Sequence, residues 1–181
     1  MLALRNGYNA SELDRLSVDI AKRVASLDCV EDARTISTYL NIGSEVRTDQ
    51  IVEWAWSRGK RVIVPVTVKA EKQLIFSEIR SREELGIGTF GIPEPKPEYR
   101  RLVPLEDAGA VLIPGVAWDS KGYRIGYGGG FYDRKLNSVP KPLVTIGLAF
   151  EFQILTEIPK TRYDQHVGMV ETELRVIRAV D

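Results

Sequence analysis

The sequence contains little that supports cysteine or histidine chemistry. Its 181 residues include one cysteine, Cys29, and one histidine, His166. A single cysteine excludes an internal disulfide and a metal site built from several thiolates, so we expect Cys29 to be a small buried thiol. A single histidine excludes paired-histidine metal motifs and leaves little room for a histidine-based triad. We expect His166 to be a surface residue rather than a ligand.

The sequence also lacks net charge and long apolar runs. Its 25 basic residues balance 25 acidic ones, which is atypical of proteins that coat nucleic acid. The N-terminus has no apolar run of the kind found in signal peptides, and no window approaches the roughly 20 apolar residues that span a bilayer. We therefore expect a cytoplasmic protein without nucleic-acid or membrane partners, in which anions bind only at local basic sites.

What the sequence does contain is typical of one globular domain. The chain is 44% hydrophobic and 28% charged, and it is long enough for one sizeable core. It has no internal repeat, low-complexity tract or long linker. We expect residues 1–181 to form a single domain that acts on small molecules as a monomer or a small homo-oligomer.

The first part of the chain predicts two helices and two strands. Apolar residues at intervals of three and four predict a helix over 11–27, with Ser11 and Asp14 at its start. β-Branched and aromatic residues predict a strand over 35–40, and a helix then runs from Thr48 to near Gly59. A nearly continuous apolar run predicts a strand over 62–66. Strand, helix and strand within about thirty residues indicate a right-handed parallel crossover.

The second part predicts more strands around an irregular middle. Residues 73–79 alternate enough for a strand, with a sheet edge as a candidate position. Residues 86–104 form mostly loop because they contain four prolines and three glycines. Further strands are predicted over 110–115 and 144–150, a helix from near Phe131, and two short strands within 167–180. The sum is an α/β fold, three-layer α/β/α with a largely parallel central sheet.

Four glycines lie within the five positions Gly126–Gly130, directly before the predicted helix. Ligands of such sheets bind beyond the carboxyl ends of the strands, where this loop begins. Glycines let an anion approach without meeting a Cβ, and the free N–H groups of a helix start add donors. The neighbouring cations suit phosphate, and Asp133 suits magnesium, so the loop predicts a nucleoside triphosphate site. The cations are Lys121, Arg124, Arg134 and Lys135.

The spacing of these glycines excludes the two commonest nucleotide loops. The dinucleotide fingerprint needs glycines spaced further apart after an early strand, and a Walker loop needs Gly-Lys-Ser or Gly-Lys-Thr. The alternative is that the glycines only form a tight turn. The charged and aromatic residues around them favour an anion site.

Four motifs, in order, resemble one enzyme family. GYRIGYGGGFYDR, preceded by VLIPGVAWD, is similar to the ATP-binding signature of the 5-formyltetrahydrofolate cyclo-ligases, also called 5,10-methenyltetrahydrofolate synthetases. YLNIGSEVRT over 39–48 resembles the folate-contacting segment of that family, FGIPEP over 90–95 its Gly-Ile-x-Glu-Pro loop, and IGLAFEFQ over 146–153 its penultimate strand. The resemblance covers nearly the whole chain.

The resemblance implies an ATP- and magnesium-dependent ring closure of 5-formyltetrahydrofolate, with ATP as co-substrate. Such chemistry needs positioning and phosphate stabilisation more than a strong base, which agrees with the scarcity of histidine. The family pattern places magnesium on Asp133 and Asp164. It places ATP on Arg5, Arg124, Ile125, Gly126, Tyr127, Gly128, Gly129, Gly130, Phe131 and Tyr132.

For the folate, the resemblance implies contacts from Leu40, Glu45 and Tyr132. The Glu45 carboxylate would accept hydrogen bonds from the amino group and ring N–H of the pterin. Alternatives from the residues themselves are that Leu40 is a core residue and that Glu45 is a solvated loop carboxylate before a helix. Trp118 and Tyr132 either stack on a ligand ring or pack against the sheet.

Three positions depart from the family pattern. Met1 stands where a lysine is usual, so either the N-terminus has been cut or reassigned, or another cation such as Lys121 or Lys135 substitutes. Arg47 replaces a commonly acidic residue, and Gly168 replaces a second aspartate. Two alternative functions follow: a non-catalytic folate- or nucleotide-binding relative, and a sugar-phosphate isomerase or CoA-transferase-like enzyme on a similar scaffold.

Overall fold

The computed structural model describes residues 1–140 and 143–179. The helices are α1 (Leu2–Asn6), α2 (Ala10–Ala25), α3 (Asp28–Glu31), α4 (Asp49–Ser57) and α5 (Phe131–Ser138). The strands are β1 (Thr35–Ser37), β2 (Arg61–Val68), β3 (Gln73–Ile79), β4 (Leu85–Ile87), β5 (Pro93–Pro95), β6 (Ala110–Ile113), β7 (Ala117–Asp119), β8 (Arg124–Ile125), β9 (Thr145–Leu148), β10 (Ile154–Leu155), β11 (Met169–Glu171) and β12 (Val176–Arg178). The tail strands predicted within 167–180 are therefore present, and Val180 lies outside the described residues.

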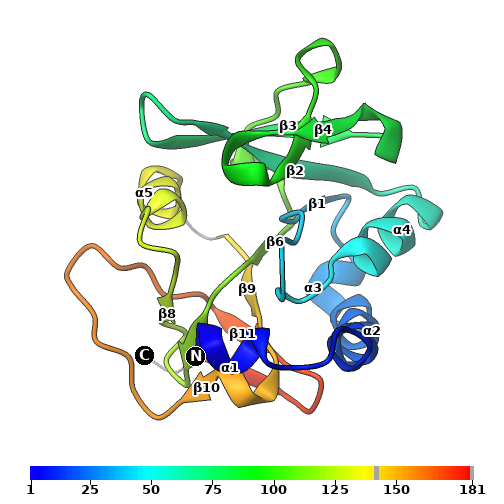
Figure 1. Ribbon diagram of the computed structural model, residues 1–181. Coiled ribbons are helices and arrows are strands. Elements are labelled where there is room, and N and C mark those ends of the chain that lie inside the picture. Colours follow the sequence, from blue (N-terminus) through cyan, green and yellow to red (C-terminus); the bar gives the residue numbers. More distant parts are fainter. Residues whose placement is uncertain (141–142, 180–181) are drawn as a thin grey trace.

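Seven strands form the central sheet, in the order β12-β11-β9-β6-β1-β2-β3 (Figure 1). The inner neighbours β11, β9, β6, β1 and β2 pair in parallel, and the two edge strands β12 and β3 pair antiparallel. This confirms the largely parallel sheet and the edge position of residues 73–79. It also confirms that the strands on either side of α4 are parallel neighbours.

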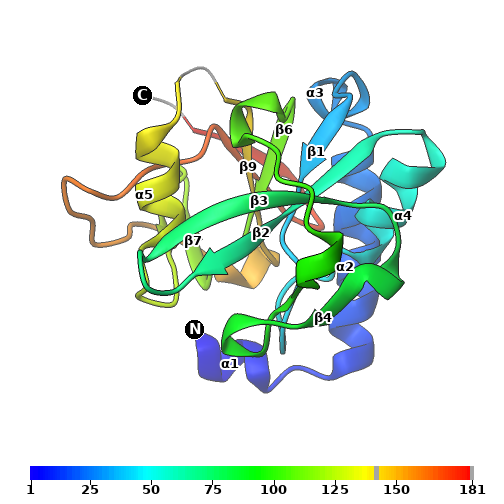
Figure 2. The same ribbon diagram turned by 90° about the horizontal axis from the view of Figure 1, so that it is seen from above.

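Both faces of the sheet are buried. Along β6, Ala110 and Leu112 pack into the cluster that contains α2 and α4, whereas Val111 and Ile113 pack into the cluster that contains α5. This alternation follows from the two-residue period of a strand. Seen from above, the helices lie on opposite sides of the sheet, as the three-layer prediction requires (Figure 2).

The N-terminal helix prediction is wrong in its cap and its end. Asn9, not Ser11, caps α2: its side-chain oxygen accepts a hydrogen bond from the Ser11 amide at 2.9 Å. The helix stops at Ala25, and α3 follows as a separate turn. Cys29 on α3 is half-buried rather than buried.

Several short strands escape the sequence pattern. The region 86–104 contains the end of β4 and all of β5, which form a small antiparallel hairpin. The strand predicted over 35–40 ends at Ser37, and β7, β8 and β10 form a small second sheet after β6. Across residues 1–140 and 143–179, no helix combines the length and apolar character needed to cross a bilayer.

Candidate active site

The glycine loop leaves the sheet at the carboxyl end of β6. Strands β7 and β8 first form a short hairpin, in which the Val116 amide donates to the Ile125 carbonyl at 2.7 Å. Gly126–Gly130 follow directly, and α5 begins at Phe131 as predicted. The loop therefore lies at the sheet edge where α/β proteins bind ligands.

The loop conformation depends on its glycines at two positions. Gly128 and Gly130 have φ angles of +85° and +61°, in the left-handed region that other residues rarely adopt. At Gly126 and Gly128, an added Cβ would meet nothing within 4 Å. The space beside the loop is open, so its backbone amides can face a ligand.

Arg134 ties the loop to the turn between β2 and β3. Its guanidinium donates to the Gly129 carbonyl at 2.7 Å and to the Lys72 carbonyl at 2.9 Å, and it lies over the Phe131 ring. Arg134 was a candidate phosphate contact from the sequence. Here it donates to two backbone carbonyls, so it holds the shape of the loop.

Arg124 and Asp133 form an ion pair across the loop. Nη2 of Arg124 donates to Asp133 Oδ1 at 2.9 Å, and Nη1 donates to the Gln165 carbonyl at 3.0 Å. The Arg124 side chain is only 4% exposed. The sequence assigned these residues separately, to phosphate and to magnesium, whereas the ligand-free protein pairs them with each other.

Arg5 reaches the same place from α1. Its side chain is buried and donates three hydrogen bonds: to Ser44 Oγ at 2.9 Å, to the Gly115 carbonyl at 3.3 Å, and to the Tyr127 hydroxyl at 2.6 Å. The N-terminal helix is thereby joined to the end of β6 and to the glycine loop. Arg5 therefore lies next to the glycine loop, as the resemblance implies.

Glu45 is the buried carboxylate at the centre of the site. The residue is 5% exposed, and its side chain accepts a hydrogen bond from the Ile42 amide at 2.9 Å. Burial raises the pKa of Glu45, while hydrogen bonds from Ile42 and Tyr127 and the charge of Arg5 oppose that shift. The solvated-loop alternative for Glu45 is therefore wrong.

The charge of this carboxylate acts on three tyrosines. Burial, followed by the charge of Glu45, raises the pKa of Tyr39, Tyr127 and Tyr132. The Tyr39 hydroxyl donates to the Val46 carbonyl at 3.1 Å, and Arg124 lies over the Tyr132 ring. We call Arg5, Tyr39, Glu45, Tyr127 and Tyr132 the Glu45 cluster.

Two residues that the sequence offered as ligand contacts pack into the core. Leu40 is buried in the apolar cluster below α2 and α4. Trp118 is fully buried, and its ring lies so close to Gly115 and Gly147 that a Cβ at either position would overlap it. For both residues, the structure supports the packing alternative.

The acidic residues near α5 form only a partial metal site. Asp133 Oδ1 also accepts the Gln165 amide at 3.1 Å, which brings the segment after Asp164 to the loop, but Asp164 itself accepts the Thr161 amide at 2.6 Å. Over residues 1–140 and 143–179, no group of three or more His, Cys, Asp and Glu side chains could hold a metal. Magnesium commonly binds through one or two carboxylates together with substrate phosphates, so Asp133 fits a magnesium that arrives with a triphosphate.

His166 is exposed, as expected.

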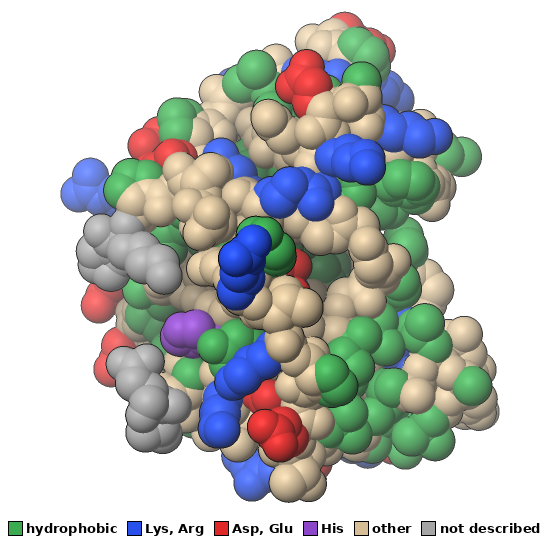
Figure 3. All heavy atoms as spheres, turned by 90° about the vertical axis from the view of Figure 1, so that its left-hand side faces the viewer, with side chains coloured by type: hydrophobic (Ala, Val, Ile, Leu, Met, Phe, Trp, Pro, Cys, Tyr) green, Lys and Arg blue, Asp and Glu red, His purple; other side chains and the backbone are tan. Residues whose placement is uncertain are grey.

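The side of the molecule that carries α5 and β8 has Lys and Arg side chains around a central hollow (Figure 3). Net charge alone does not reveal this local arrangement, because the chain as a whole is neutral. Basic side chains on this face favour an anionic ligand.

Sequence reasoning missed two polar residues that shape the site, the half-buried Ser44 and the buried Gln153. Ser44 accepts from Arg5, as described above, and Gln153 donates to the Gly115 and Val116 carbonyls at 3.1 and 2.9 Å. Gln153 also caps the Phe150 amide at 2.9 Å. Only the resemblance of the segment 146–153 pointed to this region, and no local pattern identifies the partners of a buried glutamine.

Known proteins resemble this chain over nearly its whole length. A model described as the 5-formyltetrahydrofolate cyclo-ligase family matches residues 1–173. The 5-formyltetrahydrofolate cyclo-ligase of Escherichia coli K12 is 30% identical over 174 residues, which cover 95% of this chain and 96% of that protein. The enzyme of the same name from Haemophilus influenzae is 29% identical over 163 residues, covering 89% and 87%.

Two solved structures share the fold. The NMR structure of Aquifex aeolicus 5,10-methenyltetrahydrofolate synthetase matches with a TM-score of 0.86 and 31% identity, covering 99% of this chain and 89% of that one. A 5,10-methenyltetrahydrofolate synthetase from Mycoplasma pneumoniae matches with a TM-score of 0.76 and 22% identity, covering 95% and 93%. At that lower identity, the second match shows the fold alone.

Proposed function

Because the chain belongs to the 5-formyltetrahydrofolate cyclo-ligase family, we propose that its glycine loop and Glu45 cluster bind ATP and 5-formyltetrahydrofolate side by side. The chain is an enzyme of the ligase class that closes the ring of 5-formyltetrahydrofolate to give 5,10-methenyltetrahydrofolate. Family membership favours this activity over the sugar-phosphate isomerase or CoA-transferase alternative. The assignment of residues to ligands is our proposal.

The proposed reaction uses ATP to turn an oxygen into a leaving group. The formyl oxygen attacks the γ-phosphorus, the bond to the bridging oxygen breaks, and ADP leaves. The neighbouring folate nitrogen then attacks the activated carbon, the carbon–oxygen bond breaks, and phosphate leaves with the original formyl oxygen. Because neither step needs a strong base, positioning and charge stabilisation dominate.

The glycine loop and the start of α5 suit the triphosphate. Their backbone N–H groups, from Ile125 through Tyr132, provide donors for phosphate oxygens, and Gly130 leaves the helix start without a side-chain cap. Arg5 and Arg124 supply positive charge next to the loop. In this proposal Arg124 exchanges part of its pairing with Asp133 for a phosphate oxygen.

The Glu45 cluster suits the pterin. A buried carboxylate surrounded by tyrosines can accept paired hydrogen bonds from the amino group and ring N–H of the pterin, while the rings cover its faces. Tyr132 directly follows the loop, and burial and the charge of Glu45 raise its pKa, so we assign it to both proposed ligands. Leu40 belongs to the apolar core next to this cluster, and we assign it to the folate side of the site.

Asp133 and Asp164 would hold magnesium bound to the triphosphate. The metal would supply positive charge that stabilises the phosphoryl group during transfer. Asp133 is the better placed of the two, because it pairs with Arg124 next to the glycine loop. Asp164 instead accepts a hydrogen bond from the Thr161 amide of its own turn.

One observation carries the proposal. Three segments far apart in the sequence come together around Tyr127 of the glycine loop. Arg5 of α1 donates to the Tyr127 hydroxyl, and the charge of Glu45, from the segment before α4, raises the pKa of Tyr127. Folate-side and nucleotide-side residues of the family pattern are therefore adjacent. A transfer from ATP to a folate oxygen requires this adjacency.

The test is the near-ultraviolet absorbance of the methenyl product. Mixing the protein with ATP, magnesium and 5-formyltetrahydrofolate should generate that band, and omitting ATP or chelating magnesium should abolish it. Folded protein that binds both substrates without forming the band would instead be a non-catalytic relative. Absence of both binding and product would refute the proposed function.

A further inference from the structure

The Tyr127 side chain combines an exposed ring with a hydroxyl that contacts buried groups. The residue is 56% exposed, yet its hydroxyl accepts a hydrogen bond from Arg5 Nη2 at 2.6 Å and interacts with the Glu45 carboxylate, whose pKa it lowers. The Tyr127 hydroxyl therefore interacts with both Arg5 and Glu45. A surface residue on the glycine loop thus bridges two buried charges of opposite sign.

Both partners of Tyr127 are held in place independently. Arg5 donates to Ser44 and to the Gly115 carbonyl, and Glu45 accepts the Ile42 amide. Removing the hydroxyl would therefore leave both side chains anchored. Its role is to provide an acceptor for the Nη2 group of Arg5 beside the Glu45 carboxylate, because buried charged groups are costly without partners.

The backbone around Tyr127 permits the side chain to leave this position. Gly126 and Gly128 flank it, and an added Cβ at either would meet nothing within 4 Å. Hydrogen bonds hold the residues on either side of this stretch. The Ile125 carbonyl accepts from the Val116 amide, and the Gly129 carbonyl accepts from the Arg134 side chain. A change in the position of Tyr127 therefore needs backbone rotation only at residues 126–128, and the two glycines there restrict that rotation little.

We propose that Tyr127 is a positioning residue that couples the two substrates. In the free protein its hydroxyl occupies Arg5 and Glu45, the residues assigned above to the nucleotide and to the folate. A phosphate that engages Arg5 weakens the Tyr127 bridge and frees Glu45 for the pterin, and a pterin on Glu45 frees Arg5 in return. This inference rests on the proposed function and adds a prediction of reciprocal positive cooperativity.

Tyr127→Phe tests the inference because it removes only the hydroxyl. The measurement is the Kd of 5-formyltetrahydrofolate with and without a saturating non-hydrolysable ATP analogue and magnesium, and the Kd of the analogue with and without the folate. In the wild type, each ligand should tighten the other by about tenfold, the effect of one hydrogen bond to a charged group. In Tyr127→Phe, each ligand alone should bind more tightly and the coupling factor should approach one.

Tyr99→Phe is the matched control, since Tyr99 is an exposed tyrosine at the end of the 3-10 turn 97–99, outside the Glu45 cluster. It should keep the wild-type coupling. Unchanged coupling in Tyr127→Phe, or weaker binding of each ligand alone, would overturn the inference while leaving the proposed function intact. Failure of the wild type both to bind the substrates and to form product would instead refute the proposed function.

Discussion

Arg124 shows how one residue serves the ligand-free protein and the proposed complex differently. Its guanidinium is nearly buried and divides its donors between Asp133 and the Gln165 carbonyl. A buried guanidinium without a partner is costly, so the free protein needs this pairing. A triphosphate with magnesium offers both residues replacement partners of matching charge. The ion pair is therefore compatible with the family assignment.

Replacing Arg124 with alanine should weaken the use of ATP. The change removes a charge-assisted contact of about 1.5 to 3 kcal/mol, so we expect the KM for ATP to rise at least tenfold while the Kd for folate changes little. Steady-state kinetics and calorimetric titration with ATP measure this. Arg124→Lys is the control that keeps the charge without the planar fork, and it should recover only part of the loss. An unchanged KM together with unchanged turnover would contradict the assignment.

At the scale of elements, the sequence predicts those helices and strands that apolar periodicity or glycines mark. The strand over 73–79, the start of α5 and the helix before Gly59 agree with the structure because their apolar spacing or their glycines mark them directly. The cap of α2 differs because Asn9 and Ser11 are both good caps, and only the backbone path selects Asn9. Short strands such as β7 and β8 depend on neighbours from other parts of the chain, which local sequence does not contain.

The same limit applies to the elements of the site. The glycine loop was predicted from its own residues, and Glu45 from the family resemblance. The ion pair of Arg124 with Asp133, the bonds of Arg134 to two carbonyls, and the role of Gln153 were not predicted. Each is a pairing between distant elements, and pairings are fixed by tertiary packing.

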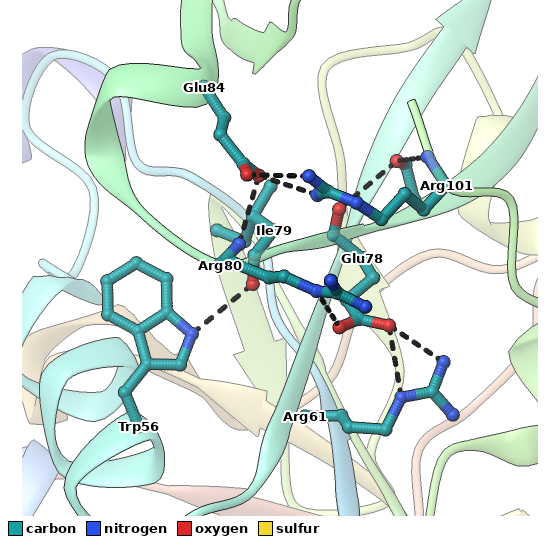
Figure 4. Close-up of polar contacts among 8 residues, drawn as sticks. Trp56, Arg61, Glu78, Ile79, Arg80, Glu84 and Arg101 are labelled. Atoms are coloured by element: carbon teal, nitrogen blue, oxygen red, sulfur yellow. Dashed lines mark hydrogen bonds and ion pairs between the residues drawn. The ribbon is translucent and has the colours of Figure 1, made fainter. Parts of the chain in front are cut away.

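A network of charged side chains fixes the corner where β3 leads into β4 (Figure 4). Arg101 donates to both oxygens of Glu84 at 2.8 Å, and Glu84 also accepts the Arg80 amide at 3.0 Å. Next to it, Glu78 on β3 pairs with Arg61 on β2 and with Arg80. The network joins the antiparallel pair of β2 and β3 to the segment that follows β5. None of its residues belongs to the Glu45 cluster.

Replacing Glu84 with glutamine should destabilise the fold without changing the chemistry. Glu84 is buried and makes a bidentate pair, so its loss should lower the free energy of unfolding by about 1 to 2 kcal/mol. Urea unfolding near neutral pH measures the change. Glu83→Gln alters the exposed neighbour and should leave stability nearly unchanged. If Glu84→Gln also altered the KM for either substrate, this corner would be part of the active site.

At the scale of the whole molecule, strand order assembles the site. β1 and β6 are neighbours in the sheet although more than sixty residues of sequence intervene between them. Glu45 follows β1, and the glycine loop follows β6, so parallel pairing of these strands delivers both segments to one edge. The sequence predicted each strand separately, whereas their order required the folded chain. The family resemblance supplied the adjacency that pattern alone did not.

The opposing pKa shifts of buried carboxylates predict a stability maximum in mild acid. Arginine partners lower the pKa of Glu78 and Glu84 below the ordinary 4.5, so their contribution is lost as pH falls below about 4.5 through the folded pKa. Burial raises the pKa of Glu45 and Glu171, so the stability associated with their protonated forms is lost as pH rises from about 4.5 through their folded pKa. Glu171 has one oxygen bonded to Arg23 at 2.6 Å and the other buried without a hydrogen-bond partner among the described residues.

Urea unfolding from about pH 3 to about pH 7 should therefore show two limbs, rising below and falling above the maximum. Glu84→Gln should flatten the acid limb, because its lowered pKa disappears. Glu171→Gln should flatten the other limb and leave the acid limb in place, because it removes a carboxylate that the fold holds above its ordinary pKa. A wild-type curve that rises steadily to pH 7, or a Glu171→Gln curve identical to it, would show that burial of Glu45 and Glu171 does not govern the pH dependence of this fold.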